Sequence, residues 1–224
     1  MNPSKILIAS SLFACSCSLG ATGDFGAPED PASLDLHDDL LLAPISFTLE
    51  PRQSAAFLTA SVFDGQSWQE HPTFLDLTGG TLETSIELDT GLWLDRFELR
   101  FADVSLGGGE QESGFGLTDI LVSLGAPHPC DGERWADGDD RVDAEVAVAL
   151  ELDWSLVTRD GTIVPLGTQS LASSVDITLR RGAYGDEVGL SLVNPGVMWE
   201  WAGLLRIEGV MLTASGTAGA SAPD

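Results

Sequence analysis

Residues 142–158 read Val-Asp-Ala-Glu-Val-Ala-Val-Ala-Leu-Glu-Leu-Asp-Trp-Ser-Leu-Val-Thr, and this stretch decides the fold class. Every even-numbered residue from Val142 to Leu156 is apolar, whereas the acidic residues hold odd-numbered positions. Successive side chains of a β-strand point to opposite faces, so this period of two predicts one long antiparallel strand with a buried face and a solvent face. At about 3.3 Å per residue the strand would exceed roughly 50 Å, and we expect a bend or bulge near residues 147–149.

A turn signal follows this strand directly. Asp160-Gly161 is typical of a two-residue β-hairpin loop of type I′. Such a loop sets Thr158 opposite Ile163 and Leu156 opposite Pro165, which matches the apolar faces of the two strands. Because proline has no N–H to donate, Pro165 indicates that the returning strand is short or lies at a sheet edge.

Similar alternation recurs along the rest of the chain. It covers residues 45–49, 57–63, 82–88, 92–101, 120–124, 175–179, 188–192 and 204–212. Glycine, proline or polar clusters separate most of these segments, at residues 78–80, 107–109, 181–183 and 194–196. Many short strands divided by turns predict an all-β fold, either an antiparallel β-sandwich or, as the alternative, a β-barrel. We expect little or no helix, although residues 34–42 could hold one turn.

The composition of the ends sets the domain boundaries. We predict a signal peptide at residues 1–14, a flexible stem rich in Gly, Ala, Pro and acid at 15–32, and a single β-domain at 33–212. Residues 213–224 repeat Ala, Ser, Gly and Thr without an apolar period, so we expect a disordered tail.

The amino terminus has the pattern of an export signal. Lys5 gives the first residues one positive charge, and residues 6–14 are an apolar run. A run of this length is too short to span a bilayer, which needs about 20 apolar residues. We therefore expect the chain to be exported.

Leu12-Phe13-Ala14-Cys15 resembles the lipobox of bacterial lipoproteins. The resemblance covers these four residues and the apolar run before them, and it implies cleavage before Cys15 with diacylglycerol on its thiol. The protein would then be an outer-membrane or cell-surface lipoprotein whose lipid is its only membrane attachment. Cleavage near Gly20 would instead release a soluble secreted or periplasmic protein, and Cys17 could take the lipid in place of Cys15.

The charge balance restricts the partners. Thirty-five acidic residues face 10 basic ones, which gives a formal net charge of -25. A surface this negative repels nucleic-acid phosphates and anionic lipid head groups, so we expect no nucleic-acid partner. A protein or a glycan partner is compatible with this charge.

The chain has three cysteines, Cys15, Cys17 and Cys130. If Cys15 carries lipid, Cys17 and Cys130 could form a disulfide in an oxidising compartment, because an even number remains. Alternatively, Cys17 belongs to the stem and Cys130 keeps a free thiol.

The sequence carries no recognisable catalytic motif. The nucleophile elbow, the paired-histidine zinc motif, the phosphate-binding loop and the Cys-x-x-Cys pair are all missing from it. We therefore expect a non-catalytic protein without a cofactor, with a secreted hydrolase as a weaker alternative. The densest acidic cluster, Asp137, Asp139, Asp140 and Asp143, fails the EF-hand spacing but could form another kind of calcium turn.

Trp199 and Trp201 lie two residues apart and would share one face of a strand. Such a pair is more often part of a core, but an exposed pair could form a platform that stacks on a sugar ring. The sequence thus predicts an exported binding or structural module, with a carbohydrate-binding domain or a carrier of apolar ligands as alternatives. A carrier would hold its ligand in a barrel interior lined by the even-numbered residues from Val142 to Leu156.

Overall fold

The computed structural model describes residues 35–106, 114–136, 138 and 140–218. The predicted signal peptide and lipobox, the whole of the predicted stem, the turn at residues 107–109, Asp137 and Asp139 therefore lie outside the described residues.

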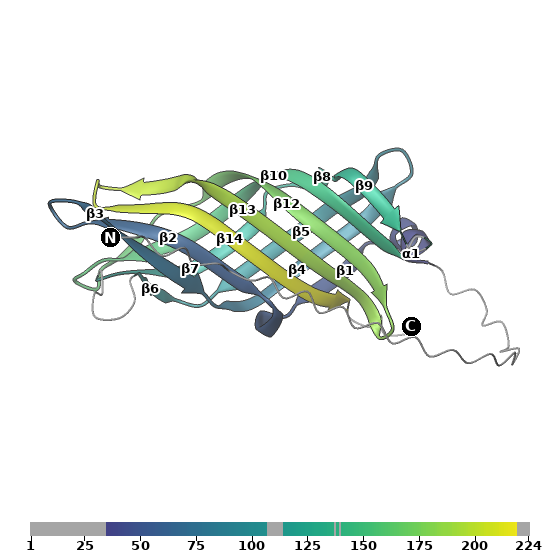
Figure 1. Ribbon diagram of the computed structural model, residues 1–224, viewed down its shortest axis with the longest axis horizontal. Coiled ribbons are helices and arrows are strands. Elements are labelled where there is room, and N and C mark those ends of the chain that lie inside the picture. Colours follow the sequence, from purple (N-terminus) through teal and green to yellow (C-terminus); the bar gives the residue numbers. More distant parts are fainter. Residues whose placement is uncertain (1–34, 107–113, 137, 139, 219–224) are drawn as a thin grey trace, which may run out of the picture. The chain divides into compact units, whose positions relative to one another are not determined.

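The described residues are almost entirely antiparallel β-structure, as predicted (Figure 1). The strands are β1 Ile45–Leu49, β2 Ala55–Phe63, β3 Trp68–Leu75, β4 Leu77–Glu87, β5 Gly91–Phe101, β6 Val104–Leu106, β7 Phe115–Leu124, β8 His128–Pro129, β9 Asp131–Ala136, β10 Arg141–Val157, β11 Ile163–Pro165, β12 Gln169–Gly182, β13 Gly185–Trp201 and β14 Leu205–Ala218. The helices in this part of the chain are α1, Leu36–Leu42, and a 3-10 turn, Pro51–Gln53. None of the described helices has the length and apolar character needed to cross a membrane.

One end of the sheet closes on itself. The strands pair in the order β1-β4-β5-β7-β10-β12-β13-β14, and β14 then pairs with β1 through Phe47↔Ala218 and Leu49↔Gly216. β8 and β9 fill the space between β5 and β10 beyond the end of β7. This end therefore has the barrel arrangement, which was the alternative expected from the sequence.

The other end is split into two leaves. β12 and β13 pair from Gly182↔Gly185 only as far as Val175↔Leu192 in the described register, after which β12 pairs with β10 and β13 pairs with β14. β3 pairs with β2 alone. One leaf therefore contains β6, β7, β10, β11 and the start of β12, and the other contains β13, β14, β2 and β3. These facing leaves give this end a sandwich-like arrangement.

Three of the edge strands at the split end carry a proline. Pro72 lies in β3, Pro165 in β11 and Pro195 in β13. A proline cannot donate a ladder hydrogen bond, so it is tolerated at edges and bulges of sheets. The prediction that Pro165 marks a short edge strand is confirmed.

Strand β10 follows the predicted alternation. All eight even-numbered residues from Val142 to Leu156 are buried. β10 has no bulge at residues 147–149, because it pairs with β12 regularly through them. The register shifts between Asp153 and Ser155 on the β7 side and between Asp143 and Glu145 on the β9 side.

The hairpin after β10 differs from the prediction by one residue. Val157 lies opposite Ile163 and Ser155 opposite Pro165. The Thr158 N–H donates to the Thr162 carbonyl at 2.9 Å, which leaves a three-residue loop with Gly161 at φ +80°. A glycine in this conformation ends the three-residue type of hairpin loop, so the register moves by one.

Two segments expected to separate strands, and the start of the expected tail, lie inside strands. Residues 78–80 belong to β4 and residues 194–196 to β13, each at a register shift. The start of the expected tail, residues 213–218, belongs to β14. Small residues suit that strand, because a Cβ on Gly216 would lie 2.3 Å from the Thr48 carbonyl oxygen.

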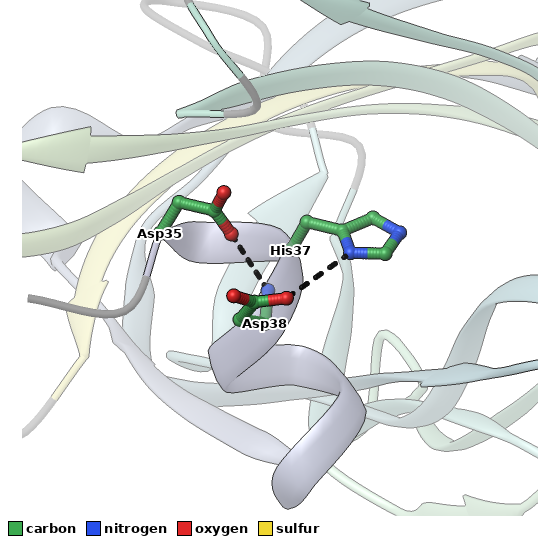
Figure 2. A group of neighbouring side chains, drawn as sticks. All are labelled: Asp35, His37 and Asp38. Atoms are coloured by element: carbon green, nitrogen blue, oxygen red, sulfur yellow. Dashed lines mark hydrogen bonds and ion pairs between the residues drawn. The ribbon is translucent and has the colours of Figure 1, made fainter. Parts of the chain in front are cut away.

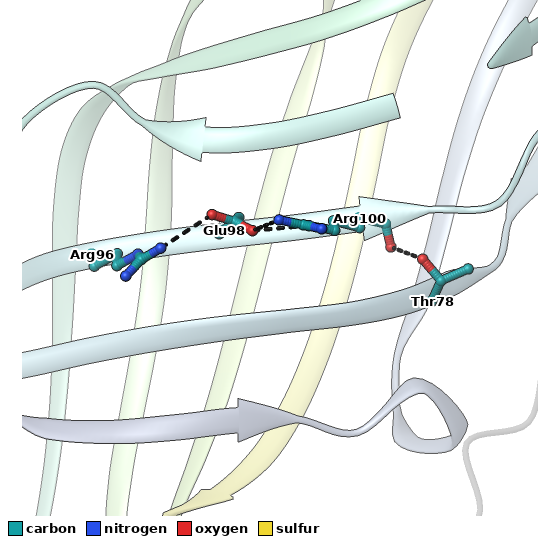
Figure 3. A network of polar contacts seen from close by, with 4 residues as sticks. All are labelled: Thr78, Arg96, Glu98 and Arg100. Carbon is teal, nitrogen blue, oxygen red and sulfur yellow. Dashed lines mark hydrogen bonds and ion pairs between the residues drawn. The ribbon is translucent and has the colours of Figure 1, made fainter. Parts of the chain in front are cut away.

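The outer face of the sheet is charged and hydrogen-bonded. On β5, the Glu98 carboxylate lies between Arg96 and Arg100, and the Thr78 hydroxyl donates to the Arg100 carbonyl at 3.0 Å (Figure 3). The hydrogen bond from Arg100 is the main cause that lowers the Glu98 pKa. Because this network is exposed to solvent, its contribution to stability is small.

Candidate functional site

The interior contains an apolar cavity where the two leaves begin to part. Its volume is about 50 Å³. Leu117 and Leu152 line it from one leaf, and Leu58 and Leu212 from the other. The alternation that buries one face of each strand explains this lining, because apolar residues on both leaves point inward.

Trp154 is the one side chain with a hydrogen-bonding group among those that line the cavity. It is 5% exposed, and its indole N–H has no hydrogen-bond partner among the described residues. Its ring meets that of Trp199 edge to face, with centroids 5.5 Å apart. An apolar cavity of this kind stays free of water, since a trapped water needs two to four polar partners.

Trp199 and Trp201 lie on β13 opposite Ile207 and Leu205. Both rings are partly buried and pack against the core, as the more common role for such a pair predicts. Trp201 also contacts Phe115, with ring centroids 6.1 Å apart. The two side chains therefore do not form an exposed flat platform.

Cys130 is buried and forms no disulfide with another described residue. Its N–H donates to the Leu92 carbonyl at 2.8 Å, which fixes it between β8 and β9. Burial, and then the charges of Glu133 and Asp131, raise its pKa to about 12. Cys17 lies outside the described residues, so the disulfide stays a prediction.

The described part of the expected calcium turn makes contacts within the protein. The Asp140 carbonyl accepts from the Arg181 N–H at 2.8 Å. The Asp143 carboxylate accepts from the Thr178 hydroxyl at 2.7 Å and from Arg141 at 3.1 Å, and these bonds lower its pKa. The calcium hypothesis gains no support from these two residues and stays a prediction.

A second group of ligand-type side chains was not singled out from the sequence. Asp35, His37 and Asp38, at the start of α1, have one ligand atom each within 4.8 Å of the others (Figure 2). Local structure accounts for them, because Asp35 caps the helix by accepting from the Asp38 N–H at 2.8 Å. His37 packs edge to face on Trp135, with centroids 4.9 Å apart.

Sequence reasoning located part of the cavity. Leu150, Leu152 and Trp154 belong to the inward face predicted from residues 142–158. The opposite wall was missed, because alternation shows which residues of a strand point inward but not which strands face each other.

Comparisons of the chain with protein-family models, with curated protein sequences and with solved structures gave no significant match.

Proposed function

We propose that the protein is an exported, non-catalytic binding module whose interior takes an apolar ligand. The observation that carries this proposal is the cavity between the leaves, whose walls are entirely apolar and include no charged side chain. Apolar cavities in proteins bind benzene or xenon because such molecules regain the dispersion contacts that an empty space lacks.

The size of the cavity restricts the ligand. Its volume of about 50 Å³ is roughly a third of the 150 Å³ known to accept benzene. It therefore suits a narrow apolar group, and a longer ligand has to separate the leaves. A sugar platform and a hydrolase gain less support, since the Trp199–Trp201 pair packs on the core and the sequence offers no catalytic motif.

The proposal also includes a location at the cell envelope. The apolar run at residues 6–14 and the lipobox-like Leu12-Phe13-Ala14-Cys15 support export and lipid attachment at Cys15. Such an anchor would hold the binding module at the cell envelope. Mass spectrometry of the native amino terminus tests this part, and an unmodified chain that begins after residue 18 would contradict it.

Xenon is the probe for the cavity, because it is apolar and small. We expect dissolved xenon to shift the methyl resonances of cavity-lining residues such as Leu152 and Leu212. Ala56→Leu should reduce the effect by about tenfold or more, because Ala56 lines the cavity and the larger side chain fills it. NMR titration of the full-length chain measures both.

Ala147→Leu is the matched control, because Ala147 lies exposed on the outer face of β10. It should leave the xenon response unchanged. A third variant, Leu152→Ala, should enlarge the cavity and admit benzene, while it lowers the free energy of unfolding by about 2–5 kcal/mol. An equal xenon response in Ala56→Leu and Ala147→Leu would contradict the proposed site.

A further inference from the structure

An exposed apolar row crosses the outer face of one leaf. Phe74 is paired with Phe57, Phe57 with Met211, and Met211 with Val193, so the four side chains are direct neighbours on adjacent strands. Phe74 is 74% exposed, Val193 57% and Met211 51%. Phe57 and Phe74 meet edge to face at 5.3 Å. A contiguous exposed row of this kind marks an interaction surface more often than scattered apolar residues do.

The row ends at the seam where β12 and β13 separate. We define the seam by Gln169–Ser174 of β12 and Val193–Trp201 of β13, which have no described pairing with each other. The Asn194 side-chain amide bridges it by donating to the Ala172 carbonyl at 3.0 Å. The cavity lies behind the seam, since Leu171 and Leu192 line it from the two sides.

Most residues of the seam are uncharged, and Glu200, near its end, is paired with Arg206. Residues 162–175 and 188–199 contain no Asp, Glu, Lys or Arg, in a chain with a formal net charge of -25. Next to the row, the outward residues Ser191 and Thr213 are neutral, whereas Asp76 lies two residues after Phe74 and Glu208 pairs with Thr59, two residues from Phe57. A path with few charged groups therefore connects the outer row, the seam and the cavity.

We propose that the row is the surface with which the protein contacts a neutral lipid bilayer, and that a lipid acyl chain enters the cavity through the seam. This inference rests on the proposed function and names its ligand class. The row supplies the apolar contact with the bilayer, and the seam lets a chain enter sideways while its polar head group stays outside. Parting of β12 from β13 supplies the space that the small cavity lacks.

Charge favours a bilayer over the other occupants of such a row. A second copy of the chain would bring two bodies of net charge -25 together. A basic protein partner would require a cluster of acidic residues around the row, whereas Ser191, Thr213 and Ala55 border it together with two carboxylates, Asp76 and Glu208. A zwitterionic bilayer requires neither.

Hydrogen–deuterium exchange with phosphatidylcholine vesicles tests the contact surface. The full chain carries Cys15→Ser and Cys17→Ser, so that no lipid is attached. We expect slower exchange in peptides from β2, β3, β13 and β14. Val193→Asp with Met211→Asp should weaken this protection about tenfold or more, because two charges would enter the bilayer interface. Vesicles that contain phosphatidylglycerol should protect less than pure phosphatidylcholine, since the chain is negative.

Ser46→Asp with Thr48→Asp is the matched control, because it adds the same two charges to exposed outer-face residues of β1 at the closed end, away from the row. It should keep most of the protection. Equal loss in the two double variants would overturn the contact surface, as would protection confined to the first residues of the chain. Dimerisation in analytical ultracentrifugation that Val193→Asp with Met211→Asp abolishes would assign the row to a second copy and contradict the proposal.

Brominated acyl chains test the seam. Phosphatidylcholine brominated on its acyl chains should quench the fluorescence of Trp154, and Trp154→Phe should remove that part of the quenching. Ser173→Cys with Asn194→Cys joins the two edges, whose side chains lie 3.5 Å apart. Oxidation of this pair should slow the quenching about fivefold or more, and reduction should restore it. Asn194→Ala, which removes the bridge, should accelerate it.

The outcomes separate the two proposals. If the oxidised pair and Asn194→Ala both quench at the original rate, the seam is not the entrance, although the xenon site stands. If xenon fails to enter the cavity, the proposed function itself fails. Quenching that persists in Trp154→Phe at its full amplitude shows that the chain does not reach the cavity and overturns the inference.

Discussion

Asp95 is a partly buried carboxylate whose surroundings disfavour its charged form. It is the extra residue where the register of β4 and β5 shifts, between the pairs Thr84↔Leu94 and Glu83↔Arg96. Its Oδ2 is buried without a hydrogen-bond partner among the described residues. Burial is the main cause that raises its pKa, a hydrogen bond with Ser85 opposes the shift, and the charge of Glu83 adds to it.

Asp95→Asn should therefore stabilise the protein at neutral pH. A raised pKa in the folded state means that ionisation of Asp95 costs stability as the pH rises through the interval between its unfolded and folded values. At neutral pH the cost is fully present, and the amide removes it. We expect the melting temperature to rise by about 1–4 °C at pH 7 and by much less near pH 2.5, where the carboxyl is protonated in both states.

The control for that comparison is Asp89→Asn, which removes the same charge from an exposed position near the end of β4. It corrects for the smaller net charge of the variant. An increase in melting temperature that is equal at both pH values, or equal in the two variants, would show that burial of Asp95 is not its cause.

Among the elements, β14 has three pairing partners. It pairs with β13 on one side and with both β1 and β2 on the other. Gly216 makes the contact with β1 close. A Cβ at this position would lie 2.3 Å from the Thr48 carbonyl oxygen and 2.9 Å from the Leu49 Cα. Both are backbone atoms, so a larger residue must push β1 away.

Gly216→Ala should consequently weaken the closure of the barrel. We expect a loss of about 1–3 kcal/mol in the free energy of unfolding, from overpacking against β1. Urea denaturation followed by circular dichroism measures it. Gly189→Ala on β13 is the control, because an added Cβ there meets nothing within 4 Å, and it should be neutral or stabilising by about 0.4–1 kcal/mol. Equal destabilisation by the two variants would count against close packing as the reason for Gly216.

At the scale of elements, sequence patterns succeeded where an inward face repeats strictly. The inward residues of β10 were all predicted, because their alternation is not interrupted. The hairpin at Gly161 was misjudged by one residue, since Asp-Gly suits both two-residue and three-residue loops and only the Thr158–Thr162 backbone bond distinguishes them. The sequence prediction ended β14 at Leu212, because the small residues that follow, among them Gly216 at the close contact with β1, have the composition of a tail.

For the molecule as a whole, the dominant long-range force is repulsion among acidic groups. The formal net charge is -25, and acidic residues of β10 such as Asp143 and Glu145 lie on the solvent side of the sheet. Concentrating this charge on a folded surface costs free energy that the expanded chain avoids.

Salt should therefore raise the melting temperature. We expect an increase of at least about 3 °C between 10 mM and 300 mM sodium chloride, with most of it below about 150 mM, because the Debye length has then fallen to roughly 8 Å. Differential scanning calorimetry measures the curve. Sucrose at equal osmolarity controls for solvent exclusion, and a melting temperature that rises linearly with salt, or not at all, would contradict screening.

The combination of a closed end and a split end could not be predicted from the sequence. Which strands become neighbours depends on contacts between distant segments, and Phe47 pairs with Ala218 across nearly the whole described chain. The cavity depends on the same pairings, because its walls belong to two leaves. Alternation gave the fold class and one wall of the site, whereas the strand order and the opposite wall required the structure.

The prolines of the split end affect how readily the protein aggregates at high concentration. Unpaired strand edges are templates on which another chain can add a strand, and such addition leads to domain swapping or fibres. Pro72, Pro165 and Pro195 place a residue without an N–H on the edge strands β3, β11 and β13, and the remaining edge strand, β6, is only three residues long. A neighbouring chain would meet a gap in the ladder at β3, β11 and β13, so the prolines oppose polymerisation through these edges.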